Sequence, residues 1–267
     1  MNSSAPIGVF DSGVGGLSVL RAIRAALPYE NLCYVADSGH VPYGSKTPAY
    51  LQERSLALTR FLLTHNVKAV VVACNTATVA AVTHLRATFP VPIIAIEPAV
   101  KPAVLATQTG VVGVIATTAT LASEQFSALL TRFGNGVTIL SQACPHLVRQ
   151  VEKGDLTSAT TRALIQQYTA PIVAAGADML VLGCTHYPFL RPLLDEVVGS
   201  QVTLLDTGAA VTRQLSNILA AQNLLNPASV LGQEQFWTSG DAKQAQAVFS
   251  TLWGQPIKLQ SLPQAFA

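Results

Sequence analysis

Two apolar runs that each lead into a cysteine constrain the fold of this chain more than any other feature. The first run covers residues 69–73 and ends at Cys74, and the second covers residues 179–182 and is followed by Gly183 and Cys184. A continuous aliphatic run of this length, bounded by polar residues, is typical of a strand buried on both faces of a parallel sheet. Ligand sites in open α/β sheets lie beyond the carboxyl ends of such strands. The pattern predicts two thiols at one site, approached from opposite sides.

The order of elements repeats along the chain. Each half begins with an aliphatic strand, at residues 7–10 and 110–116, and ends with a strand that leads into an acid, Glu97 or Asp206. The equivalent landmarks lie about 105 to 110 residues apart, and such self-similarity indicates two α/β halves. We expect two similar domains, each a mostly parallel sheet flanked by helices, related by a pseudo-twofold axis and with the active site at their interface.

The tail after Asp206 decides the domain boundaries. It holds about 60 residues, which is small for a third domain, so we expect it to return to the first half. The first domain then comprises residues 1–97 with 208–267 and carries Cys74. The second comprises residues 98–207 and carries Cys184.

Composition excludes several classes of protein. Of the 267 residues, 50% are hydrophobic and only 11% are charged, which predicts much buried sheet and is compatible with a homodimer interface. The net charge of +2 is spread without a basic run, so nucleic acid is not expected as the main partner. The apolar runs are shorter than the roughly 18 residues of a membrane span, and no membrane association is expected.

Cysteine usage predicts the compartment. The four cysteines show no CxxC spacing, and the opening residues lack the basic and apolar regions of a signal peptide. We therefore expect a cytoplasmic enzyme with free thiols. A lone cysteine at a strand end is more often a packing residue than a functional one, but matched positions in two halves favour function. Cys33 falls inside a predicted strand and is expected in the core, and neither it nor Cys144 is matched in the other half.

The segment 11–16, Asp-Ser-Gly-Val-Gly-Gly, is a glycine-rich turn between a strand and a helix. Its backbone amides could bind an anion, but it lacks the GxGxxG order and a Walker lysine, so a nucleotide is a poor fit. Asp11 would repel an anion and attract an ammonium group. Carboxylate-binding amides beside an acid fit an amino acid.

Short polar side chains flank both cysteines. Ser12, Asn75, Thr76 and Thr185 are hydrogen-bonding residues that also cap helices routinely. His186, two residues after Cys184, could orient or protonate it, whereas Thr76 holds the matching position in the first half. Two more acids, Asp37 and Glu152, are by default solvated.

Two thiols that face one carbon suit inversion of a stereocentre. One thiolate removes the α-proton as general base and the other thiol donates a proton to the opposite face. Amides and hydroxyls on the substrate carboxylate would stabilise the enediolate charge that develops. No lysine lies in a recognisable pyridoxal phosphate context, so we expect neither a cofactor nor a metal.

Four blocks of this sequence resemble the signature blocks of the bacterial glutamate racemases, in the family's order and spacing. They are residues 11–16, Val-Pro-Tyr-Gly at 41–44, Ala-Cys-Asn-Thr-Ala at 73–77 and Gly-Cys-Thr-His-Tyr-Pro at 183–188. The resemblance runs from about residue 7 to about residue 215. It implies interconversion of L- and D-glutamate without a cofactor, which supplies D-glutamate for peptidoglycan.

The resemblance also implies roles for individual residues. Cys74 and Cys184 would be the two acid/base thiols, with Asp11, His186 and Glu152 as catalytic helpers and Asp37 as a further acid of that kind. The residues implied in substrate binding are Asp11, Ser12, Tyr43, Gly44, Asn75, Thr76, Thr117, Thr118, Thr185 and His186.

Other functions stay open on the sequence. The closest is a racemase of the same superfamily that acts on aspartate or a hydantoin. A thiol hydrolase would use Cys184 as nucleophile and His186 as base, but residues two apart on a chain rarely face each other, and Cys74 would be idle. A non-catalytic amino-acid sensor, or a protein that inhibits DNA gyrase, would bind without turnover.

Overall fold

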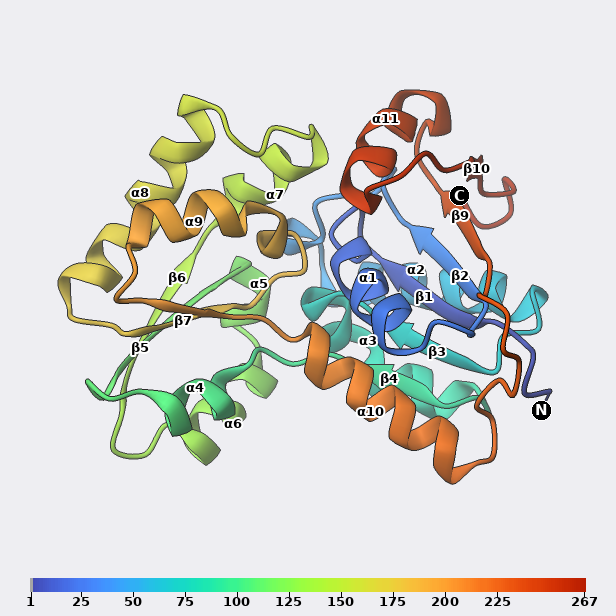
Figure 1. The fold of residues 1–267 in the computed structure, drawn as a ribbon, viewed down its shortest axis with the longest axis horizontal. Coiled ribbons are helices and arrows are strands. Elements are labelled where there is room, and N and C mark those ends of the chain that lie inside the picture. The colour runs from blue at the N-terminus through green and yellow to red at the C-terminus, as the bar shows by residue number, and fades with distance from the viewer. Residues whose placement is uncertain (1) are drawn as a thin grey trace. The chain divides into compact units, whose positions relative to one another are not determined.

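The structure is a computed structural model that describes residues 2–267, and the chain divides into two compact units. One unit comprises the described chain up to Ile96 together with Gly208–Ala267, and the other comprises Glu97–Thr207. Each unit has its own sheet, labelled in Figure 1.

The first unit contains a six-stranded sheet in the order β10-β9-β2-β1-β3-β4, in which every paired strand is parallel. Its strands are β1 (Ile7–Asp11), β2 (Leu32–Ala36), β3 (Ala69–Val72), β4 (Ile93–Ala95), β9 (Glu234–Thr238) and β10 (Leu259–Ser261). Its helices are α1 (Leu17–Ala26), the 3₁₀ turn η1 (Tyr43–Ser45), α2 (Pro48–Thr64), α3 (Asn75–Thr88), α10 (Gly208–Ala221) and α11 (Ala242–Trp253).

The second unit contains a four-stranded parallel sheet in the order β6-β5-β7-β8. Its strands are β5 (Val111–Ala116), β6 (Thr138–Ala143), β7 (Met179–Leu182) and β8 (Thr203–Leu205). Its helices are α4 (Val100–Ala106), α5 (Thr118–Leu121), α6 (Glu124–Phe133), α7 (Pro145–Glu152), α8 (Ala159–Ala174), the 3₁₀ turn η2 (Tyr187–Leu190) and α9 (Arg191–Val198).

The two sheets share one topology. The order β2-β1-β3-β4 in the first unit corresponds to β6-β5-β7-β8 in the second. Phe10 of the central strand pairs with Val72, and Ile115 pairs with Leu182 in the same way. The predicted fold class, two mostly parallel sheets flanked by helices, is confirmed.

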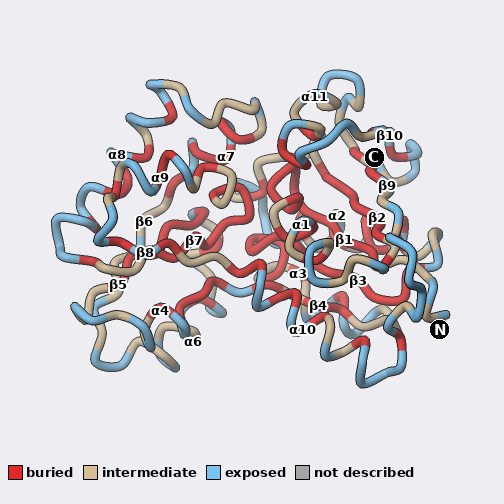
Figure 2. Tube along the Cα trace, in the orientation of Figure 1, coloured by how far each residue is buried: buried red, intermediate tan, exposed pale blue. Residues whose placement is uncertain are grey.

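Both faces of the first sheet are covered, which explains why its central strands read as unbroken apolar runs. In the first unit Phe10 and Val72 belong to a core cluster with Leu58 and Leu62 of α2. On the other face the ring of Tyr34 lies 6.4 Å from that of Phe249 in α11. Figure 2 shows the central strands β1, β3, β5 and β7 as largely buried and the outer parts of the helices as exposed.

Several helices begin at residues that the sequence marks as caps. Thr47, Ser158 and Asp241 stand immediately before α2, α8 and α11, and each side chain accepts a hydrogen bond from the first turn of its helix. The helix α3 begins at Asn75, directly after the first cysteine. The Cys74 side chain occupies the N-cap position.

Three of the short elements are α4, α7 and β10. Short segments carry too little periodicity to be recognised, and packing rather than propensity stabilises them. In α7, for example, Leu147, Val148 and Val151 are buried.

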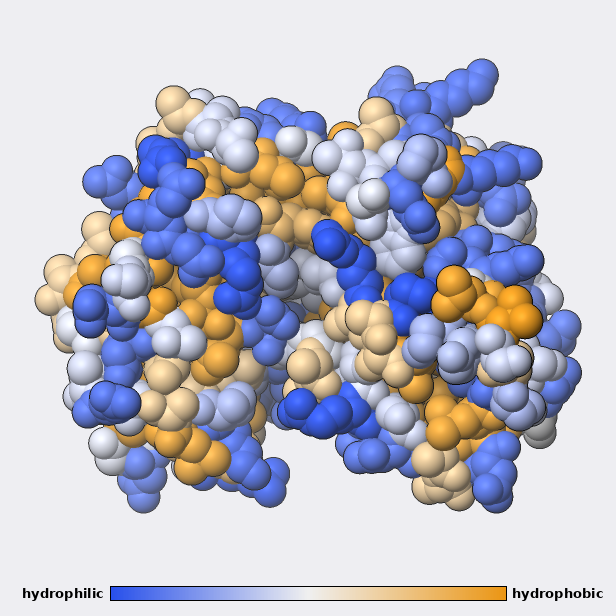
Figure 3. Space-filling model, viewed as in Figure 1, coloured by the Kyte–Doolittle hydropathy of each residue, from blue (hydrophilic) through white to orange (hydrophobic). Residues whose placement is uncertain are grey.

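The surface mixes polar and apolar side chains, as the visible face in Figure 3 shows. Within residues 2–267 no helix combines the length and the apolar character that crossing a membrane requires.

A buried ion pair fastens the amino-terminal edge of the first sheet. The Nζ atom of Lys68 lies 2.5 Å from Glu30 Oε2, with 0% and 3% of the two side chains exposed. Lys68 also donates to the main-chain oxygen of Ser3, and Glu30 Oε1 accepts from the backbone amide of Asn226 at 2.8 Å. The pair thus joins the segments before β1, β2 and β3 and links them to the segment that holds Asn226.

Replacing Lys68 by Met is expected to lower the free energy of unfolding by about 3–5 kcal/mol, because Glu30 would remain buried without its counter-charge. Urea unfolding followed by tryptophan fluorescence measures this, since both tryptophans, Trp237 and Trp253, belong to the first unit. Lys243→Met, at an exposed position of the same unit, should change stability by less than about 0.5 kcal/mol. Equal effects of the two substitutions would contradict the role of the pair.

Candidate active site

Cys74 lies at the carboxyl edge of the first sheet, directly after β3. The preceding Ala73 donates its backbone N–H to the oxygen of Phe10 in the central strand at 2.8 Å. The Cys74 side chain is 4% exposed, and its Sγ accepts from the backbone N–H of Ala77 at 3.4 Å. The first turn of a helix therefore contacts this sulfur.

Cys184 lies at the equivalent edge of the second sheet, after β7. Gly183 donates its N–H to the oxygen of Ile115 at 2.8 Å, which repeats the bond of Ala73. A Cβ at position 183 would lie 2.9 Å from the Cβ of Ala116, so only glycine fits this close approach. Cys184 is 7% exposed.

Asn75 carries polar atoms that the fold leaves open. Its side chain is buried, yet neither its Oδ1 nor its Nδ2 has a hydrogen-bond partner among residues 2–267. An unpaired buried amide costs about 1–3 kcal/mol and is rare in native proteins. One donor and one acceptor beside Cys74 are thus available to a ligand. Thr76 is also buried.

The glycine-rich turn after β1 differs from expectation. The sequence suggested that its amides face a ligand anion, but the Asp11 carboxylate accepts from the amides of Gly13 and Gly16 itself, with Oδ2 at 3.3 and 2.8 Å. A Cβ at position 16 would lie 2.6 Å from the Asp11 Cβ, so the tight turn requires glycine there. The Tyr34 hydroxyl further fixes the turn by donating to the Gly13 oxygen at 2.6 Å. Asp11 and Ser12 are both buried.

Tyr43 and Gly44 lie in η1, within the loop that follows β2. The Tyr43 hydroxyl donates to Asp37 Oδ2 at 2.5 Å. Burial, together with the adjacent Asp37 charge, raises the pKa of Tyr43 well above its usual value, so the hydroxyl keeps its proton. The expectation that Asp37 is solvated is wrong, because it is fully buried and ion-paired to Arg54 at 2.7 Å. No pattern in the sequence pointed to Arg54, which lies in α2.

His186 is the second residue of the Cys184 turn and faces back toward the thiol. Its Nδ1 lies 3.6 Å from Cys184 Sγ, and its Nε2 lies 2.6 Å from Glu152 Oε1 at the end of α7. Residues two apart on a chain rarely face each other, but Cys184 and His186 do. The strand ends at Leu182, and a turn closed by the Tyr187 amide on the Cys184 oxygen brings the two side chains together.

The charge state of His186 follows from its partners. Burial lowers the pKa of His186, but its hydrogen bonds to Cys184 and Glu152 and the charges of these groups outweigh burial, so the pKa rises well above the usual value. The imidazole is therefore protonated at neutral pH. Both ring nitrogens then donate, Nδ1 toward the sulfur and Nε2 toward the carboxylate.

The remaining candidates in the second unit lie near the same edge. Thr117 is the N-cap of α5, where its Oγ1 accepts from the Thr120 amide at 3.2 Å. Thr118 is exposed and Thr185 is buried.

The other two cysteines differ in environment. Burial raises the pKa of Cys33, inside β2, to about 12, so it is an inert core thiol as expected. Cys144 follows β6 and is fully buried. Its burial, and to a lesser degree the charge of the nearby Cys184, raise the pKa of Cys144 far above its usual value. Neither thiol is poised for proton transfer.

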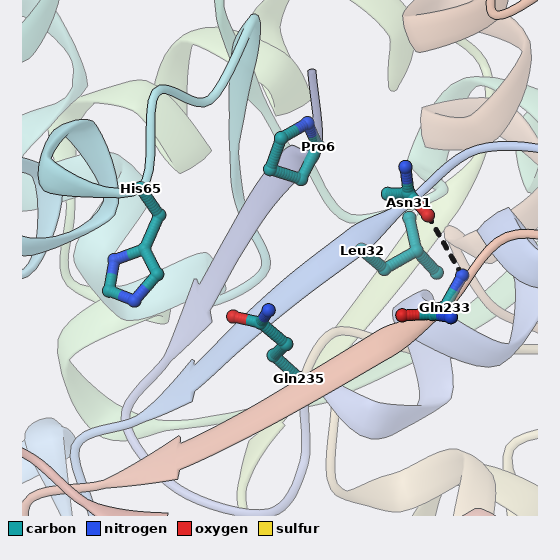
Figure 4. A pocket seen from close by; sticks show the side chains of 6 residues that line it. All are labelled: Pro6, Asn31, Leu32, His65, Gln233 and Gln235. Carbon is teal, nitrogen blue, oxygen red and sulfur yellow. Dashed lines mark hydrogen bonds between the residues drawn. The ribbon is translucent and has the colours of Figure 1, made fainter. Parts of the chain in front are cut away.

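A pocket of about 260 Å³ lies at the opposite, amino-terminal edge of the first sheet (Figure 4). Its lining residues are Pro6, Asn31, Leu32, His65, Gln233 and Gln235. It contains none of the predicted site residues. Within residues 2–267 no group of three or more His, Cys, Asp or Glu side chains is arranged to hold a metal ion.

Each unit thus gathers its own candidates at the carboxyl ends of its strands. In the first unit these are Asp11, Ser12, Tyr43, Gly44, Cys74, Asn75 and Thr76. In the second unit they are Thr117, Thr118, Glu152, Cys184, Thr185 and His186.

Similarity to known proteins shows the family of the chain. The sequence model of the Asp/Glu/hydantoin racemase family matches residues 7–215. The chain belongs to this racemase family. Among its relatives, the glutamate racemase of Stutzerimonas stutzeri is 54% identical over 97% of this chain and 98% of that protein. The glutamate racemase of Methylococcus capsulatus is 53% identical over 98% of this chain and 97% of that protein.

Solved structures of family members have the same fold. A glutamate racemase isoform from Bacillus anthracis superposes with a TM-score of 0.89 at 32% identity and covers 99% of each chain. The Escherichia coli glutamate racemase, solved with L-glutamate and an activator, superposes with a TM-score of 0.85 at 30% identity. The superposition covers 96% of this chain and 98% of that chain.

Replacing Glu152 by Gln is expected to lower the pKa of His186, because burial would then be opposed by Cys184 alone. An NMR titration of the imidazole signals measures this, with His186→Asn used to assign the resonance. Glu196→Gln, at an exposed position of the same unit, serves as control and should leave the pKa unchanged. A His186 pKa that is the same in wild type and Glu152→Gln would refute the pairing.

The same pair sets a pH dependence of stability. Since the folded pKa of His186 lies above its ordinary value near 6.5, the stabilisation is fully present below about pH 6.5 and is lost as pH rises through the folded pKa. The stability advantage of wild type over Glu152→Gln should shrink across that rise.

Proposed function

We propose that this chain is a cofactor-independent glutamate racemase that interconverts L- and D-glutamate with two cysteines. The observation that carries the proposal is the equivalence of Cys74 and Cys184. Each thiol follows the same strand of the same topology, after a residue whose amide bonds to the central strand. The identity to glutamate racemases over nearly the whole chain supports glutamate as the substrate.

In the proposed reaction the two thiols act on opposite faces of the α-carbon. One sulfur, as thiolate, removes the α-proton, and the C–H electron pair passes into the carboxylate to give an enediolate. The other sulfur, as thiol, gives its proton to the opposite face of the carbon. The reverse reaction exchanges the two roles.

The polar groups at the two edges supply binding and charge stabilisation in this proposal. Donors such as the Asn75 amide and the hydroxyls of Ser12, Thr76, Thr117, Thr118 and Thr185 would bind the substrate carboxylates and the enediolate. Asp11 would bind the ammonium group, and Tyr43 and Gly44 would shape the pocket.

His186 and Glu152 would serve Cys184. A protonated imidazole whose Nδ1–H points at Sγ can return a proton to that sulfur after the sulfur has delivered its own. Glu152 holds the ring in this orientation by accepting from Nε2. In the first unit Thr76 stands at the matching position, so the two thiols have different proton supplies.

The deciding experiment is incubation of chelator-treated protein with L-glutamate in deuterium oxide, followed by chiral chromatography and mass spectrometry. D-glutamate that carries deuterium at the α-carbon, with L-aspartate unchanged, is the expected result. Turnover of aspartate alone would reassign the substrate within the family. Glutamate binding without exchange would replace the enzyme by an amino-acid sensor.

Cys74→Ala and Cys184→Ala should each lower racemisation in both directions by at least about 10²–10⁴-fold, the usual contribution of a positioned acid or base. Cys33→Ala, which alters a core thiol inside β2, should keep most of the activity. Full activity in either site variant would exclude the two-thiol mechanism. Initial rates from both enantiomers provide the measurement.

Asn75→Leu separates binding from stability. Removing an unpaired buried amide should leave the free energy of unfolding unchanged or raise it by up to about 1–3 kcal/mol, while the KM for glutamate rises. Urea unfolding and steady-state kinetics measure the two quantities. Asn217→Leu, on the exposed side of α10, should alter neither by much. A destabilised Asn75→Leu with normal KM would assign the amide a structural role.

The arrangement of Cys184, His186 and Glu152 favours one other activity. A thiol, an imidazole and a carboxylate in this order resemble the nucleophile, base and orienting acid of a thiol hydrolase. Incubation with p-nitrophenyl acetate and mass spectrometry tests it. An acetyl group on Cys184, with hydrolysis that survives Cys74→Ala, would support a hydrolase, and no adduct would leave the racemase alone.

We further propose that the enzyme works in the cytoplasm as a homodimer. Four free cysteines suit a reducing compartment, and the low charged fraction of 11% suits a buried interface. Analytical ultracentrifugation of the purified chain would show a single monomeric species if the homodimer is wrong.

A further inference from the structure

The last residues of the chain lie outside the part that matches the sequence model of the racemase family, yet they are bound to the helix beside the candidate site. The family match ends at residue 215. Leu262 belongs to the same core cluster as Cys74 and Tyr43. The ring of Phe266 packs 5.5 Å from that of Phe61 in α2. This contact holds the main chain of residues 266–267 against α2.

Arg54 of α2 connects this segment to Asp37. Its Nη2 donates to the main-chain oxygen of Phe266 at 2.9 Å, and its Nη1 donates to that of Ala267 at 3.2 Å. The same guanidinium binds Asp37 with two bonds, from Nε to Oδ2 at 2.9 Å and from Nη2 to Oδ1 at 2.7 Å. Only the planar fork of arginine can make a bidentate carboxylate contact and still reach two carbonyls.

Asp37 connects Arg54 to Tyr43 through its carboxylate. The carboxylate is fully buried, and the backbone amide of Asp37 is bound to the Asp11 oxygen at 2.9 Å, so it has little freedom of its own. Its Oδ2 accepts from the Tyr43 hydroxyl at 2.5 Å. Tyr43 begins the turn that carries Gly44, and this turn contacts α3, the helix that starts immediately after Cys74.

We propose that Arg54 is a positioning residue for substrate binding. By holding Asp37, it fixes the Tyr43 hydroxyl and with it the turn of Tyr43 and Gly44. The segment 266–267 completes this arrangement, because its two main-chain oxygens accept hydrogen bonds from Nη2 and Nη1 of Arg54. The C-terminal residues are thereby part of the substrate-binding apparatus. The proposal rests on the proposed function for the identity of the substrate and for the part of Tyr43 and Gly44 in binding it.

The alternative is that the pair of Arg54 and Asp37 serves stability alone, as the buried pair of Lys68 and Glu30 does at the opposite edge. The partners of that second pair are main-chain atoms of Ser3 and Asn226, far along the strands from any candidate residue. The chain of bonds through Arg54 instead ends on a side chain that the family resemblance assigns to substrate. The two roles predict different results for Arg54→Lys, which keeps the charge and loses the fork.

The test compares wild type with Arg54→Lys and Phe266→Ala, and uses Arg60→Lys, at an exposed position of the same helix, as control. We expect kcat/KM for glutamate to fall about 10–100-fold in Arg54→Lys, mainly through a higher KM, the usual effect of losing a group that orients a binding residue. Phe266→Ala, which leaves the ion pair intact but frees the two oxygens, should raise KM in the same direction. Arg60→Lys should change neither KM nor kcat.

A second readout does not depend on activity. The protein is labelled with 3-fluorotyrosine, and Tyr43→Phe assigns the ¹⁹F resonance of Tyr43. Arg54→Lys and Phe266→Ala should shift or broaden this resonance, whereas Arg60→Lys should leave it in place. If wild type fails to racemise glutamate, the proposed function fails, and the ¹⁹F result still decides the positioning role.

A normal KM and an unchanged Tyr43 resonance in folded Arg54→Lys would overturn the proposal. If Arg54→Lys does not fold, Phe266→Ala decides by the same two measurements. A fall in kcat at constant KM, without change at Tyr43, would also overturn it, because the effect would then not pass through the binding turn.

Discussion

The main-chain hydrogen bond made by the residue before each cysteine is the constraint on which the rest depends. Ala73 binds Phe10 and Gly183 binds Ile115, in both cases at the last rung between the cysteine strand and the central strand. A strand buried on both faces cannot leave this amide unpaired, so the chain stays in the sheet up to the residue before the thiol. The sulfur is thereby placed at the carboxyl edge, where the backbone is released and polar side chains can gather.

The two units share one sheet topology but place different chemical groups at equivalent positions. Asp37 and Cys144 hold equivalent places, since each donates its amide to the last residue of the central strand, Asp11 or Ala116. In the first unit this place carries a carboxylate ion-paired with arginine, and in the second a buried neutral thiol. The second unit instead receives its charges from His186 and Glu152. Unlike surroundings suit a reaction in which one thiol gives a proton while the other takes one.

The candidate site is also where the chain departs from the rules that stabilise it. The amide of Asn75 is buried and unpaired among residues 2–267, and an imidazole and a carboxylate are brought out of water beside Cys184. Elsewhere buried charges are paired with several partners, as at Lys68 and Glu30. Polar groups kept open at a cost in stability are expected where a ligand is to bind, because the ligand completes their hydrogen bonds.

The sequence by itself determined the fold class, the doubling of the sheet and the positions of both thiols, because hydrophobic periodicity and the residues that end a strand are local properties of the chain. It could not reveal that His186 turns back on Cys184, that Asp11 occupies the amides of its own turn, or that Arg54 joins Asp37 to residues 266–267. These contacts depend on turn geometry and on segments more than 200 residues apart, as the separation of Arg54 from Phe266 illustrates. Only the packed structure brings such groups together, since no local pattern records which distant donor meets which acceptor.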